Sequence, residues 1–468
     1  MGCTEKVVIV GAGISGLACA FRLKQLGCPC LVLEAEDRVG GVIASVRRNG
    51  FLFELGPQFP RFPKPLWRLA CELGLESEFL VGNAKAKRYI FRHGALHPAV
   101  FSPGALLTTR LVSTASKLRI LTDVFGSTEP PPQEESLADF VERKFGKDVA
   151  ENLVDPIVSS VFFGDARKMG MEGAFAVLAE WERKHGSVVR GALRSRNSKP
   201  AQASSLKVTD ALPSLGSFRN GMGSLPEALV RNLPDRVKCK ERVVALTLAK
   251  GEVTGRDDAW QIVLANGETV RANHLVLALP AYEVARLLEI ALPDLAQRLG
   301  AIEYAPVCVV STAYNRSQIS HALDGFGFMV PRQEKLNTIC TFWNSSMFPQ
   351  HAPIRKVLLT SFAGREFREG AHHPNDESYE RSVIAENAKI LGISGAPLDR
   401  EIWRHSSALP QYNVGHASRV TEINQLLSQL PNLHLTGNYM QGRSLGDCVA
   451  LADEIAARVQ SQIRHSNI

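Results

Sequence analysis

The sequence has little cysteine, and the cysteines that it has are scattered. Nine are present in 468 residues, no two form a Cys-x-x-Cys pair, and none are spaced as metal ligands. This distribution argues against a disulfide-stabilised secreted domain and favours a reducing compartment. We therefore expect a cytoplasmic protein without a bound metal ion.

Long apolar runs are also absent. No stretch of about 18 apolar residues is present, so we expect no transmembrane helix. Because the first strand of the fold is predicted to begin by residue 6, we expect no signal or transit peptide. The start Met1-Gly2-Cys3 suggests acylation, but Lys6 stands where the myristoylation pattern requires Ser or Thr. We expect the protein to remain in the compartment where it is made.

Acidic residues are missing from two long stretches. Residues 79–122 and 183–209 contain no Asp or Glu, and each carries seven Lys or Arg residues. Such patches attract phosphates, carboxylates or anionic lipid headgroups. The leucines between residues 106 and 121 lie at helical spacing among these cations, which is typical of an amphipathic helix on a membrane surface. The alternatives are a solvated basic surface and an apolar stripe that belongs to the core.

The strongest positive signal lies in residues 6–56. The run Val7 to Val10 is short, apolar and β-branched, which predicts a strand buried on both faces. A helical pattern then runs from Ile14 to Leu26, and a second strand ends at Glu34. This order predicts a βαβ unit. Its turn has the pattern G-x-G-x-x-G and consists of Gly11, Ala12, Gly13, Ile14, Ser15 and Gly16.

Each glycine of this turn has a separate task. Gly11 forms the tight turn, Gly13 lets the backbone approach a pyrophosphate, and Gly16 lets the helix pack closely on the strand. The unpaired amides at the start of the helix then face the phosphates. Glu34 is placed to accept hydrogen bonds from a ribose. We therefore predict that this turn binds a dinucleotide cofactor.

Two further motifs indicate which dinucleotide is bound. Arg38-Val39-Gly40-Gly41 follows Glu34, and Phe53-Glu54-Leu55-Gly56-Pro57 comes soon afterwards. This arrangement resembles the amine-oxidase-like flavoproteins, in which the arginine and the paired glycines lie beside the FAD diphosphate and ribityl chain. FAD is therefore the expected cofactor. The alternative is that Gly40-Gly41 is only a turn.

The remaining patterns predict an α/β fold: a Rossmann-like FAD-binding domain with a sheet-based substrate domain and a helical membrane-facing insertion. Residues 92–184 are mostly helical, with Ser136 as the expected N-cap of one helix. Residues 305–363 suggest an antiparallel sheet covered by a helix near 376–391. Near the C-terminus, a strand at 433–436 leads through a glycine loop into a helix whose N-terminus could point at the flavin. The expected boundaries are 1–91, 206–281 and 403–468 for the FAD-binding domain, 92–205 for the helical insertion and 282–402 for the substrate domain.

Over essentially its whole length the chain resembles the protoporphyrinogen oxidases, FAD enzymes that aromatise a porphyrinogen. The resemblance rests on GAGISGL, RVGG, FELGPQF, KRYIFRHGALHP, FRNGMGSLPEAL, GFGFMVP, ALPQYNVGH and TGNYMQGRSLGDCV. The last two motifs discriminate, because many FAD oxidases share the first. The resemblance implies a porphyrinogen substrate, O2 as oxidant, peripheral contact with a membrane and no nucleic-acid partner, and a homodimer is compatible with it.

The resemblance also implies roles for single residues. Arg88 corresponds to an arginine that meets a propionate, and Phe326, Phe328 and Met329 correspond to apolar contacts of the macrocycle. A solvated rim cation and packing inside the sheet are the alternatives. Trp403 either flanks the isoalloxazine or is a core residue. The other positions implied to contact FAD are Glu34, Arg38, Gly41, Val42, Gly56, Pro57, Gln58, Phe59, Val243, Arg443, Ser444 and Leu445.

No side chain is nominated as catalytic, because the flavin N5 carries the chemistry and the protein holds the macrocycle and excludes water. His416 and Asp447 are the nearest candidates for polar tuning, and structural roles are their alternative. Coproporphyrinogen III, with four propionates instead of two, is the alternative substrate. An amine oxidase should show acidic residues that guide the amine, and the acid-free stretches argue against it. A flavin-binding protein without turnover remains a further alternative.

Overall fold

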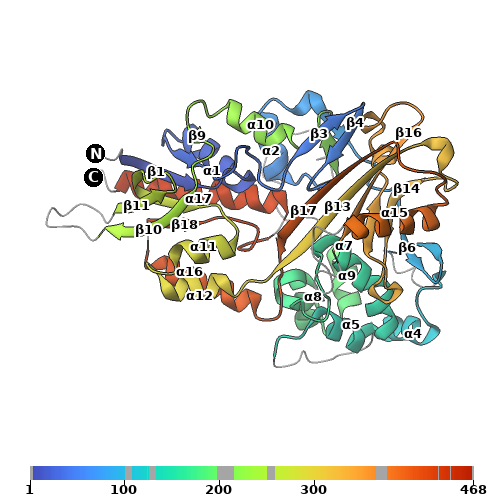
Figure 1. Cartoon of the computed structure of the whole chain (residues 1–468). Helices are drawn as coiled ribbons and strands as arrows, with labels where there is room; N and C mark the ends of the chain where they lie inside the picture. Colours follow the sequence, from blue (N-terminus) through green and yellow to red (C-terminus); the bar gives the residue numbers. More distant parts are fainter. Residues whose placement is uncertain are drawn as a thin grey trace. The chain divides into compact units, whose positions relative to one another are not determined.

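The structure is a computed structural model that describes residues 4–100, 108–123, 125, 133–197, 215–249, 259–364, 377–430, 432–442 and 444–465. The chain forms two compact units, each assembled from separate segments. Unit 1 comprises Met1–Ala84, Leu212–Glu303 and Ser418–Ile468, and unit 2 comprises Lys85–Ala211 and Tyr304–Ala417. Figure 1 labels the elements of both units. The predicted α/β fold is confirmed.

Unit 1 is built on a sheet with the order β10-β11-β12-β1-β2-β9, and β18 pairs with β12. Strands β1, β2, β9, β12 and β18 are parallel to one another, whereas β10 and β11 are antiparallel. The side chains of Val7, Val8 and Ile9 are fully buried, as the unbroken apolar run predicts. The bounds are β1 (Thr4–Val10), β2 (Leu31–Leu33), β9 (Val237–Lys238), β10 (Val243–Ala249), β11 (Ala259–Leu264), β12 (Thr269–Leu277) and β18 (Leu433–Leu435).

Strand β12 is continuous over Thr269–Leu277. Its first part pairs with β11 and its last part with β18, while β1 pairs along its length. The polar residues Arg271 and Asn273 interrupt the apolar pattern but not the backbone ladder.

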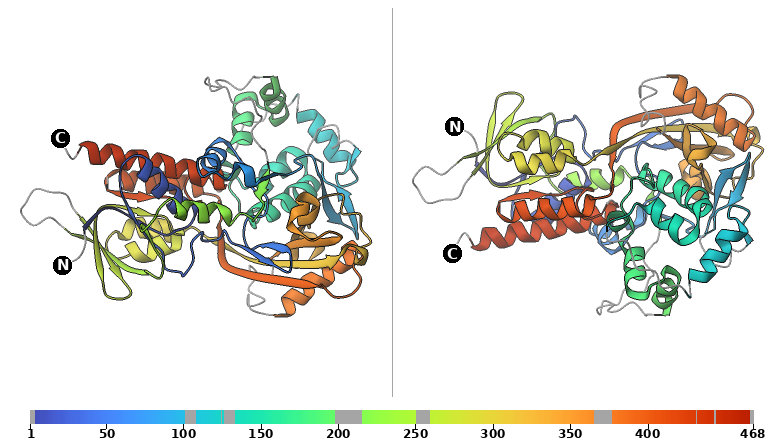
Figure 2. Two further views of the ribbon diagram at one scale, coloured as in Figure 1. Left: turned by 90° about the horizontal axis from the view of Figure 1, so that it is seen from above. Right: turned by 90° about the horizontal axis from the view of Figure 1, so that it is seen from below.

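Helix α17 (Leu445–His465) packs along α1 (Ile14–Gln25), as the red and dark-blue helices in Figure 2 show. The two ends of the chain therefore meet in unit 1. The other elements of the unit are β3 (Ser45–Arg48), β4 (Phe51–Glu54), α2 (Lys64–Glu72), η1 (Glu76–Glu78), β5 (Phe79–Val81), β8 (Gly216–Phe218), α10 (Ser224–Arg231), α11 (Ala281–Leu288) and α12 (Pro293–Gly300). Helix α16 (His416–Ser428) lies almost wholly in this unit.

Unit 2 contains a second sheet with the order β17-β13-β16-β15-β14-β6-β7. The predicted antiparallel sheet is confirmed, and β6, β7 and β17 extend it. Among its described strands, β14 and β6 form the one parallel pair. The predicted covering helix is also present, because α15 packs on β13 and β15. The bounds are β6 (Lys87–Arg92), β7 (Ala95–Pro98), β13 (Tyr304–Asn315), β14 (Gly325–Met329), β15 (Thr338–Phe342), β16 (Lys356–Ala363), β17 (Asp399–Pro410) and α15 (Glu377–Leu391).

The helices of unit 2 pack around an apolar cluster that includes Phe140, Val158 and Phe162. Ser136 caps α5, because its hydroxyl accepts the N–H of Asp139, as predicted. The bounds are α4 (Thr114–Asp123), α5 (Leu137–Phe145), α6 (Lys147–Val149), the π-helical turn η2 (Ala150–Val154), α7 (Asp155–Phe162), α8 (Met171–His185) and α9 (Val188–Asn197), with short turns η3 (Arg316–Gln318), η4 (Arg332–Glu334), α13 (Asn344–Met347) and η5 (Pro349–His351).

The two units differ from the predicted boundaries in three places. Strand β6 falls almost wholly in the predicted FAD-binding segment 1–91 but belongs to unit 2, because it pairs with β14. Most of β17 lies outside the predicted substrate domain although it pairs with β13. Helices α11 and α12 belong to unit 1, where α11 contacts β10. The division into three domains stays a prediction, since the helices and the second sheet fall in one unit. Among the helices of the described ranges, none combines the length and the apolar character needed to span a bilayer.

Candidate active site

The glycine turn between β1 and α1 requires glycine at two positions. Gly11 has a φ of +104°, and a Cβ there would lie 2.7 Å from the carbonyl oxygen of Ala278. A Cβ on Gly16 would lie 2.0 Å from the carbonyl oxygen of Gly11. Both contacts are with backbone, which cannot move aside. The turn therefore has the tight bend and the close helix packing of a dinucleotide-binding loop.

Gly13 has a different environment. A Cβ added there would meet no atom within 4 Å. Gly13 lies directly before α1, which has no side-chain cap and no acidic residue in its first turn. The first amides of the helix therefore remain available to an anion in the open space beside Gly13. This cradle fits the diphosphate of a dinucleotide.

The Arg38-Val39-Gly40-Gly41 motif packs directly on this turn. The N–H of Gly40 donates to the carbonyl of Ala12 at 2.8 Å, and Gly40 forms a bridge with Gly13. Gly41 adopts a φ of +58°, and the guanidinium of Arg38 donates to its carbonyl at 2.8 Å. Gly40 and Gly41 are therefore part of the cradle rather than an isolated turn. Val42 follows with 44% of its surface exposed beside this loop.

Glu34 lies at the end of β2, and its carboxylate accepts the N–H of Ala12 at 2.7 Å. A second backbone donor is the N–H of Glu36, at 2.9 Å. The N–H of Glu241 donates to the carbonyl of Glu34 at 2.8 Å, which brings the start of β10 beside this acid. Val243 is the first residue of β10. The roles of Glu34 at a ribose and of Val243 at the adenine stay predictions.

Glu54, in the motif FELGPQF, contacts the motif FRNGMGSLPEAL. The sequence did not indicate this contact. Its carboxylate accepts the hydroxyl of Ser45 at 2.5 Å and the N–H of Met222 at 2.8 Å. The hydroxyl oxygen of Ser45 in turn accepts the N–H of Gly223 at 2.9 Å. Burial raises the pKa of Glu54 to about 7, although these two hydrogen bonds act in the opposite direction. We call Glu54, Ser45 and the Met222–Gly223 amides the Glu54 clamp.

The residues after Glu54 divide into two kinds. Gly56 and Pro57 are partly exposed, whereas Gln58 and Phe59 are buried. The side-chain amide of Gln58 donates to the carbonyls of Glu54 and Gly56, at 3.1 and 2.9 Å. Gln58 thus fixes the loop that follows β4. Contact of these four residues with FAD stays a prediction.

The start of α17 lies beside the start of α1. Ser444 and Asp447 cap the helix reciprocally: the N–H of each donates to the other's side chain, at 3.0 and 3.1 Å. Cys448 is buried, which raises its pKa to about 11, and a hydrogen bond with Ser15 partly offsets this rise. Asp447 therefore has a structural role. Ser444 and Leu445 open the helix as expected, whereas Arg443 lies outside the described residues.

In unit 2, Arg88 lies at the end of a row of aromatic side chains. Its guanidinium carbon is 4.6 Å from the ring centre of Phe326. Phe326 contacts Phe342 edge to face at 5.3 Å, Phe342 contacts Phe362 at 5.6 Å, and Phe362 contacts Phe163 at 5.1 Å between ring centres. We call Phe326, Phe342, Phe362 and Phe163 the aromatic row. It runs across three strands to the end of α7.

The structure does not support Phe328 as a member of this surface. Phe328 is 2% exposed and packs with Tyr89 and Trp343 in a separate core cluster. Regular alternation would place Phe326 and Phe328 on one face. A bulge between Gly325 and Gly327 shifts the alternation, and Met329 instead packs with Phe342. The predicted substrate contacts of Phe326 and Met329 stay predictions.

Trp403 lies on β17 and is partly buried against the cluster that contains Phe362 and Val309. Its predicted contact with the isoalloxazine is not tested by this arrangement. His416 is 2% exposed, and its ring stacks on Tyr412 at 4.2 Å. The structure thus gives His416 a packing role.

The ALPQYNVGH motif forms hydrogen bonds with the end of α7 and with the loop that follows it. The side-chain amide of Gln411 donates to the carbonyl of Phe162 at 3.0 Å. The N–H of Gly170 donates to the carbonyl of Tyr412 at 2.8 Å, and the N–H of Val414 donates to the carbonyl of Lys168 at 2.9 Å. This motif therefore positions the end of α7, where Phe163 of the aromatic row lies.

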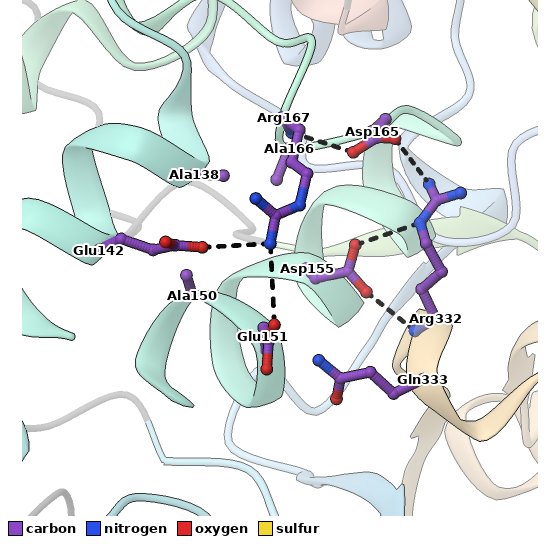
Figure 3. Close-up of a pocket in the computed structure, with 10 residues that line it drawn as sticks. All are labelled: Ala138, Glu142, Ala150, Glu151, Asp155, Asp165, Ala166, Arg167, Arg332 and Gln333. Atoms are coloured by element: carbon purple, nitrogen blue, oxygen red, sulfur yellow. Dashed lines mark hydrogen bonds and ion pairs between the residues drawn. The ribbon is translucent and has the colours of Figure 1, made fainter. Parts of the chain in front are cut away.

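A charged cavity of about 190 Å³ lies elsewhere in unit 2 and contains none of the predicted site residues. Figure 3 shows its two arginines, each held between two carboxylates. Arg167 lies 3.2 Å from Glu142, and the backbone N–H of Arg332 donates to Asp155 at 2.9 Å. Arg332 is three residues beyond Met329, so these contacts fix the end of β14 against α7.

Comparison with known proteins agrees with the geometry of unit 1. The model of a family described as flavin containing amine oxidoreductase matches residues 14–460. The chloroplastic protoporphyrinogen oxidase of Oryza sativa subsp. japonica is 31% identical, over 97% of this chain and 88% of that protein. The protoporphyrinogen oxidase of Homo sapiens is 30% identical, over 97% of this chain and 98% of that protein.

Two further similarities are informative. The coproporphyrinogen III oxidase of Bacillus subtilis (strain 168) is 28% identical, over 95% of this chain and 96% of that protein. A crystal structure from Exiguobacterium sp. 255-15 shares the fold, with a TM-score of 0.81 at 24% identity over 98% of this chain and 99% of that one. FAD is the cofactor of this family, and the chain is an oxidoreductase; the position of the FAD diphosphate in the cradle around Gly13 stays a prediction. The chain belongs to the flavin containing amine oxidoreductase family.

Proposed function

We propose that this enzyme oxidises protoporphyrinogen IX to protoporphyrin IX in haem and porphyrin biosynthesis. The observation that carries the proposal is the position of Arg88, a half-buried guanidinium stacked at the end of the aromatic row. The partly exposed rings of Phe326 and Phe342, with a cation at one end, suit a macrocycle that bears carboxylates. The names of the rice and human relatives support the same substrate.

Arg88 and the aromatic row have complementary tasks in this proposal. The planar fork of the guanidinium donates two parallel hydrogen bonds to a propionate carboxylate. The ring of Phe326 packs against the guanidinium of Arg88 and so limits the orientations of this group. Beyond Phe326, the partly exposed ring of Phe342 packs against the macrocycle, and the buried rings of Phe362 and Phe163 support Phe342 from the core. These contacts orient the substrate without acid–base catalysis by a side chain.

The bound FAD supplies a two-electron acceptor that O2 reoxidises. Conversion of a porphyrinogen to a porphyrin removes six electrons and six protons. Three molecules of O2 are therefore consumed and three of H2O2 are formed for each porphyrin.

Coproporphyrinogen III is the second candidate substrate. The Bacillus subtilis relative of that name aligns over 95% of this chain. The same surface of unit 2 suits either macrocycle, because both are apolar tetrapyrroles that carry propionates. The two substrates differ in the number of propionates, so a direct comparison of rates separates them.

We also propose that the protein is cytoplasmic and contacts a membrane through α4. This helix buries Ile120 but leaves Leu118 and Leu121 61% and 49% exposed, next to the exposed Arg119. Part of the predicted apolar stripe is thus core and part faces outward, while residues 101–107 lie outside the described residues. Sedimentation with anionic liposomes at low salt tests the proposal of membrane contact, and a protein that stays in the supernatant contradicts it.

A homodimer is a further proposal, which analytical ultracentrifugation tests.

The experiment for the proposed reaction is anaerobic reduction of the purified yellow protein. We expect protoporphyrinogen IX to bleach the flavin absorbance and to form fluorescent porphyrin, and we expect putrescine and benzylamine to do neither. Admission of air should then restore the flavin absorbance. Bleaching by an amine but not by the porphyrinogen would contradict the proposal, and no bleaching by either would indicate a flavin-binding protein without turnover.

A further inference from the structure

We propose that a second cavity of unit 2 binds a small, soluble phosphate monoester. This cavity, which we call the β16 cavity, lies beside the start of β16 and has a volume of about 360 Å³. Three cations line it: Arg316, Arg355 and Lys356. None of the described residues that line it is acidic. The proposal does not depend on the proposed function, and the cavity shares no residue with the aromatic row.

Arg316 is fixed in place without loss of its charge. Its guanidinium donates to the carbonyls of Ile319 at 2.6 Å and of His321 at 2.9 Å. Its backbone N–H donates to the carbonyl of Arg355 at 2.9 Å. Because carbonyl groups are neutral, these bonds orient the guanidinium but leave its positive charge uncompensated. The amino group of Lys356 is in the same situation, since its hydrogen-bond partner is the amide oxygen of Asn315.

Arg355 differs from the other two cations. Its side chain is exposed and has no hydrogen bond or ion pair with any described residue. Its backbone is in the left-handed region, with a φ of +60°. A residue with a large side chain rarely adopts this conformation. The cavity thus holds a guanidinium that is paired with no residue of the described ranges, on a backbone conformation that a glycine would adopt more easily.

Hydroxyl groups complete the set of donors. Ser345 lines the cavity, and its oxygen accepts the N–H of Leu358 at 3.1 Å, so that its O–H remains able to donate to a ligand. Ser346 lines the cavity as well and is exposed. Guanidinium, ammonium and hydroxyl donors together suit the oxygens of a phosphate. Three cations without a carboxylate favour a dianion over the single charge of a carboxylate ligand.

Apolar residues provide the other part of the lining. Leu323, Pro349 and Ile354 contribute to the wall, and Ile354 is 93% exposed. The volume is within the range of sites for small molecules and exceeds the needs of a bare phosphate. We therefore assign a phosphate group attached to a small organic body, with the phosphate at the three cations and the organic body against the apolar residues.

Isothermal titration of the FAD-loaded full chain tests the proposal, with phenyl phosphate, inorganic phosphate and phenol as probes in 0.15 M salt. We expect phenyl phosphate to bind more tightly than inorganic phosphate, and phenol not to bind. Arg355→Gln should weaken binding of phenyl phosphate about tenfold, as expected for loss of a charged donor. Lys389→Gln removes an exposed cation from α15 of the same unit, outside the cavity, and should leave binding unchanged.

Arg355→Gly separates binding from folding. This variant removes the cation and relieves the left-handed backbone, so we expect its melting temperature to equal or exceed that of the parent while binding is lost. Absence of binding by the parent protein, or equal binding by Arg355→Gln, would overturn the proposal. Arg355-dependent binding to phosphatidylglycerol vesicles without binding of phenyl phosphate would overturn the assignment to a soluble ester.

Discussion

Gly13 is the residue whose substitution separates cofactor binding from folding. A Cβ at this position meets no protein atom within 4 Å, and the backbone φ of −71° suits alanine. We therefore predict that Gly13→Ala leaves the stability of the apoprotein unchanged but weakens FAD binding by more than about tenfold, because the methyl group occupies the space of the diphosphate. Fluorescence titration of apoprotein with FAD measures this change.

The matched control is Gly300→Ala on α12. A Cβ there lies 3.6 Å from Ala285, an ordinary contact outside the cradle, so FAD affinity should not change. Equal FAD affinity of Gly13→Ala and the parent would show that the diphosphate does not lie beside Gly13.

Arg88 is the residue on which the proposed substrate depends. A hydrogen bond between charged groups contributes about 1.5–3 kcal/mol, so Arg88→Ala should raise KM for the porphyrinogen roughly 10- to 100-fold. The absorbance spectrum of bound FAD should remain unchanged. Lys87→Ala is the control, because this neighbouring cation on β6 is exposed and paired with Asp324 at 2.7 Å. An unaltered KM of Arg88→Ala would exclude the propionate role.

Glu54 makes stability depend on pH. Its pKa in the folded state, about 7, lies above its ordinary value of 4.5 because the carboxyl is buried. The folded state thus favours the protonated form, so the stability that Glu54 contributes is complete below about pH 4.5 and is lost as the pH rises through about 7. We predict that between pH 4.5 and 7.5 the parent loses about 3 kcal/mol more unfolding free energy than Glu54→Gln does.

Glutamine is informative here because it retains an oxygen for the N–H of Met222 but has no proton to lose. Urea unfolding at several pH values, followed by circular dichroism, measures the difference. Glu454→Gln, an exposed substitution on α17, is the control and should follow the parent at every pH. Parallel pH profiles of the parent and Glu54→Gln would contradict the account of the clamp.

The sequence predicted the structural roles of some residues but not of others. The roles of Gly11 and Gly16 follow from local spacing, since strand, turn and helix are consecutive. The Glu54 clamp could not be predicted, because Glu54 and Met222 are 168 residues apart and only the fold brings them together. The resemblance implied a macrocycle contact for Phe328, but the structure gives it the alternative role of packing inside the sheet, because the bulge between Gly325 and Gly327 depends on strand pairing and not on the local sequence.

Among the helices, α4, α5 and α8 are joined by a buried charge network. Lys144 on α5 is 4% exposed and lies 2.7 Å from Glu182 and 3.4 Å from Asp123. Asp123 also accepts the hydroxyl of Ser187 at 2.8 Å, ahead of α9. Removal of Lys144 would leave the buried Asp123 without a cation from the described residues, while Glu182 would keep its ion pair with Arg143 at 2.9 Å. Loss of one partner of a buried ion pair typically costs about 3–5 kcal/mol.

We therefore predict that Lys144→Met lowers the free energy of unfolding by about 3–5 kcal/mol or prevents the helices from folding. Lys147→Met is the control, because Lys147 is 69% exposed in a surface pair with Glu151 and should contribute less than about 1 kcal/mol. Urea unfolding followed by circular dichroism compares the variants. Equal losses of stability in the two variants would show that the network contributes no more than a surface ion pair.

Elements with a strong local signal were predicted well. Helix α5 combines a capping serine with an apolar face, and β1 is an unbroken apolar run, so neither depends on distant residues. The parallel pairing of β6 with β14 joins segments more than 200 residues apart, and no pattern in the sequence of either segment indicated it. The same holds for the extension of the sheet by β17.

For the complete chain, the main feature is that both units are discontinuous. The sheet of unit 1 is complete only after β12 and β18 have joined β1, and α17 then packs on α1. The sequence indicated that both ends of the chain belong to one cofactor domain, because each end carries a strand, a glycine loop and a helix. It did not indicate that the second sheet and the helices before it form one unit, since this grouping depends on contacts between distant segments.

The central claim is that this flavoprotein oxidises a porphyrinogen. The most direct test follows porphyrin fluorescence in air, with the purified yellow protein and with protoporphyrinogen IX and coproporphyrinogen III in parallel at matched concentrations. The account predicts faster conversion of protoporphyrinogen IX, with three O2 consumed for each porphyrin formed. Faster conversion of coproporphyrinogen III would assign the second candidate substrate, and rates no higher than autoxidation with both compounds would contradict the claim.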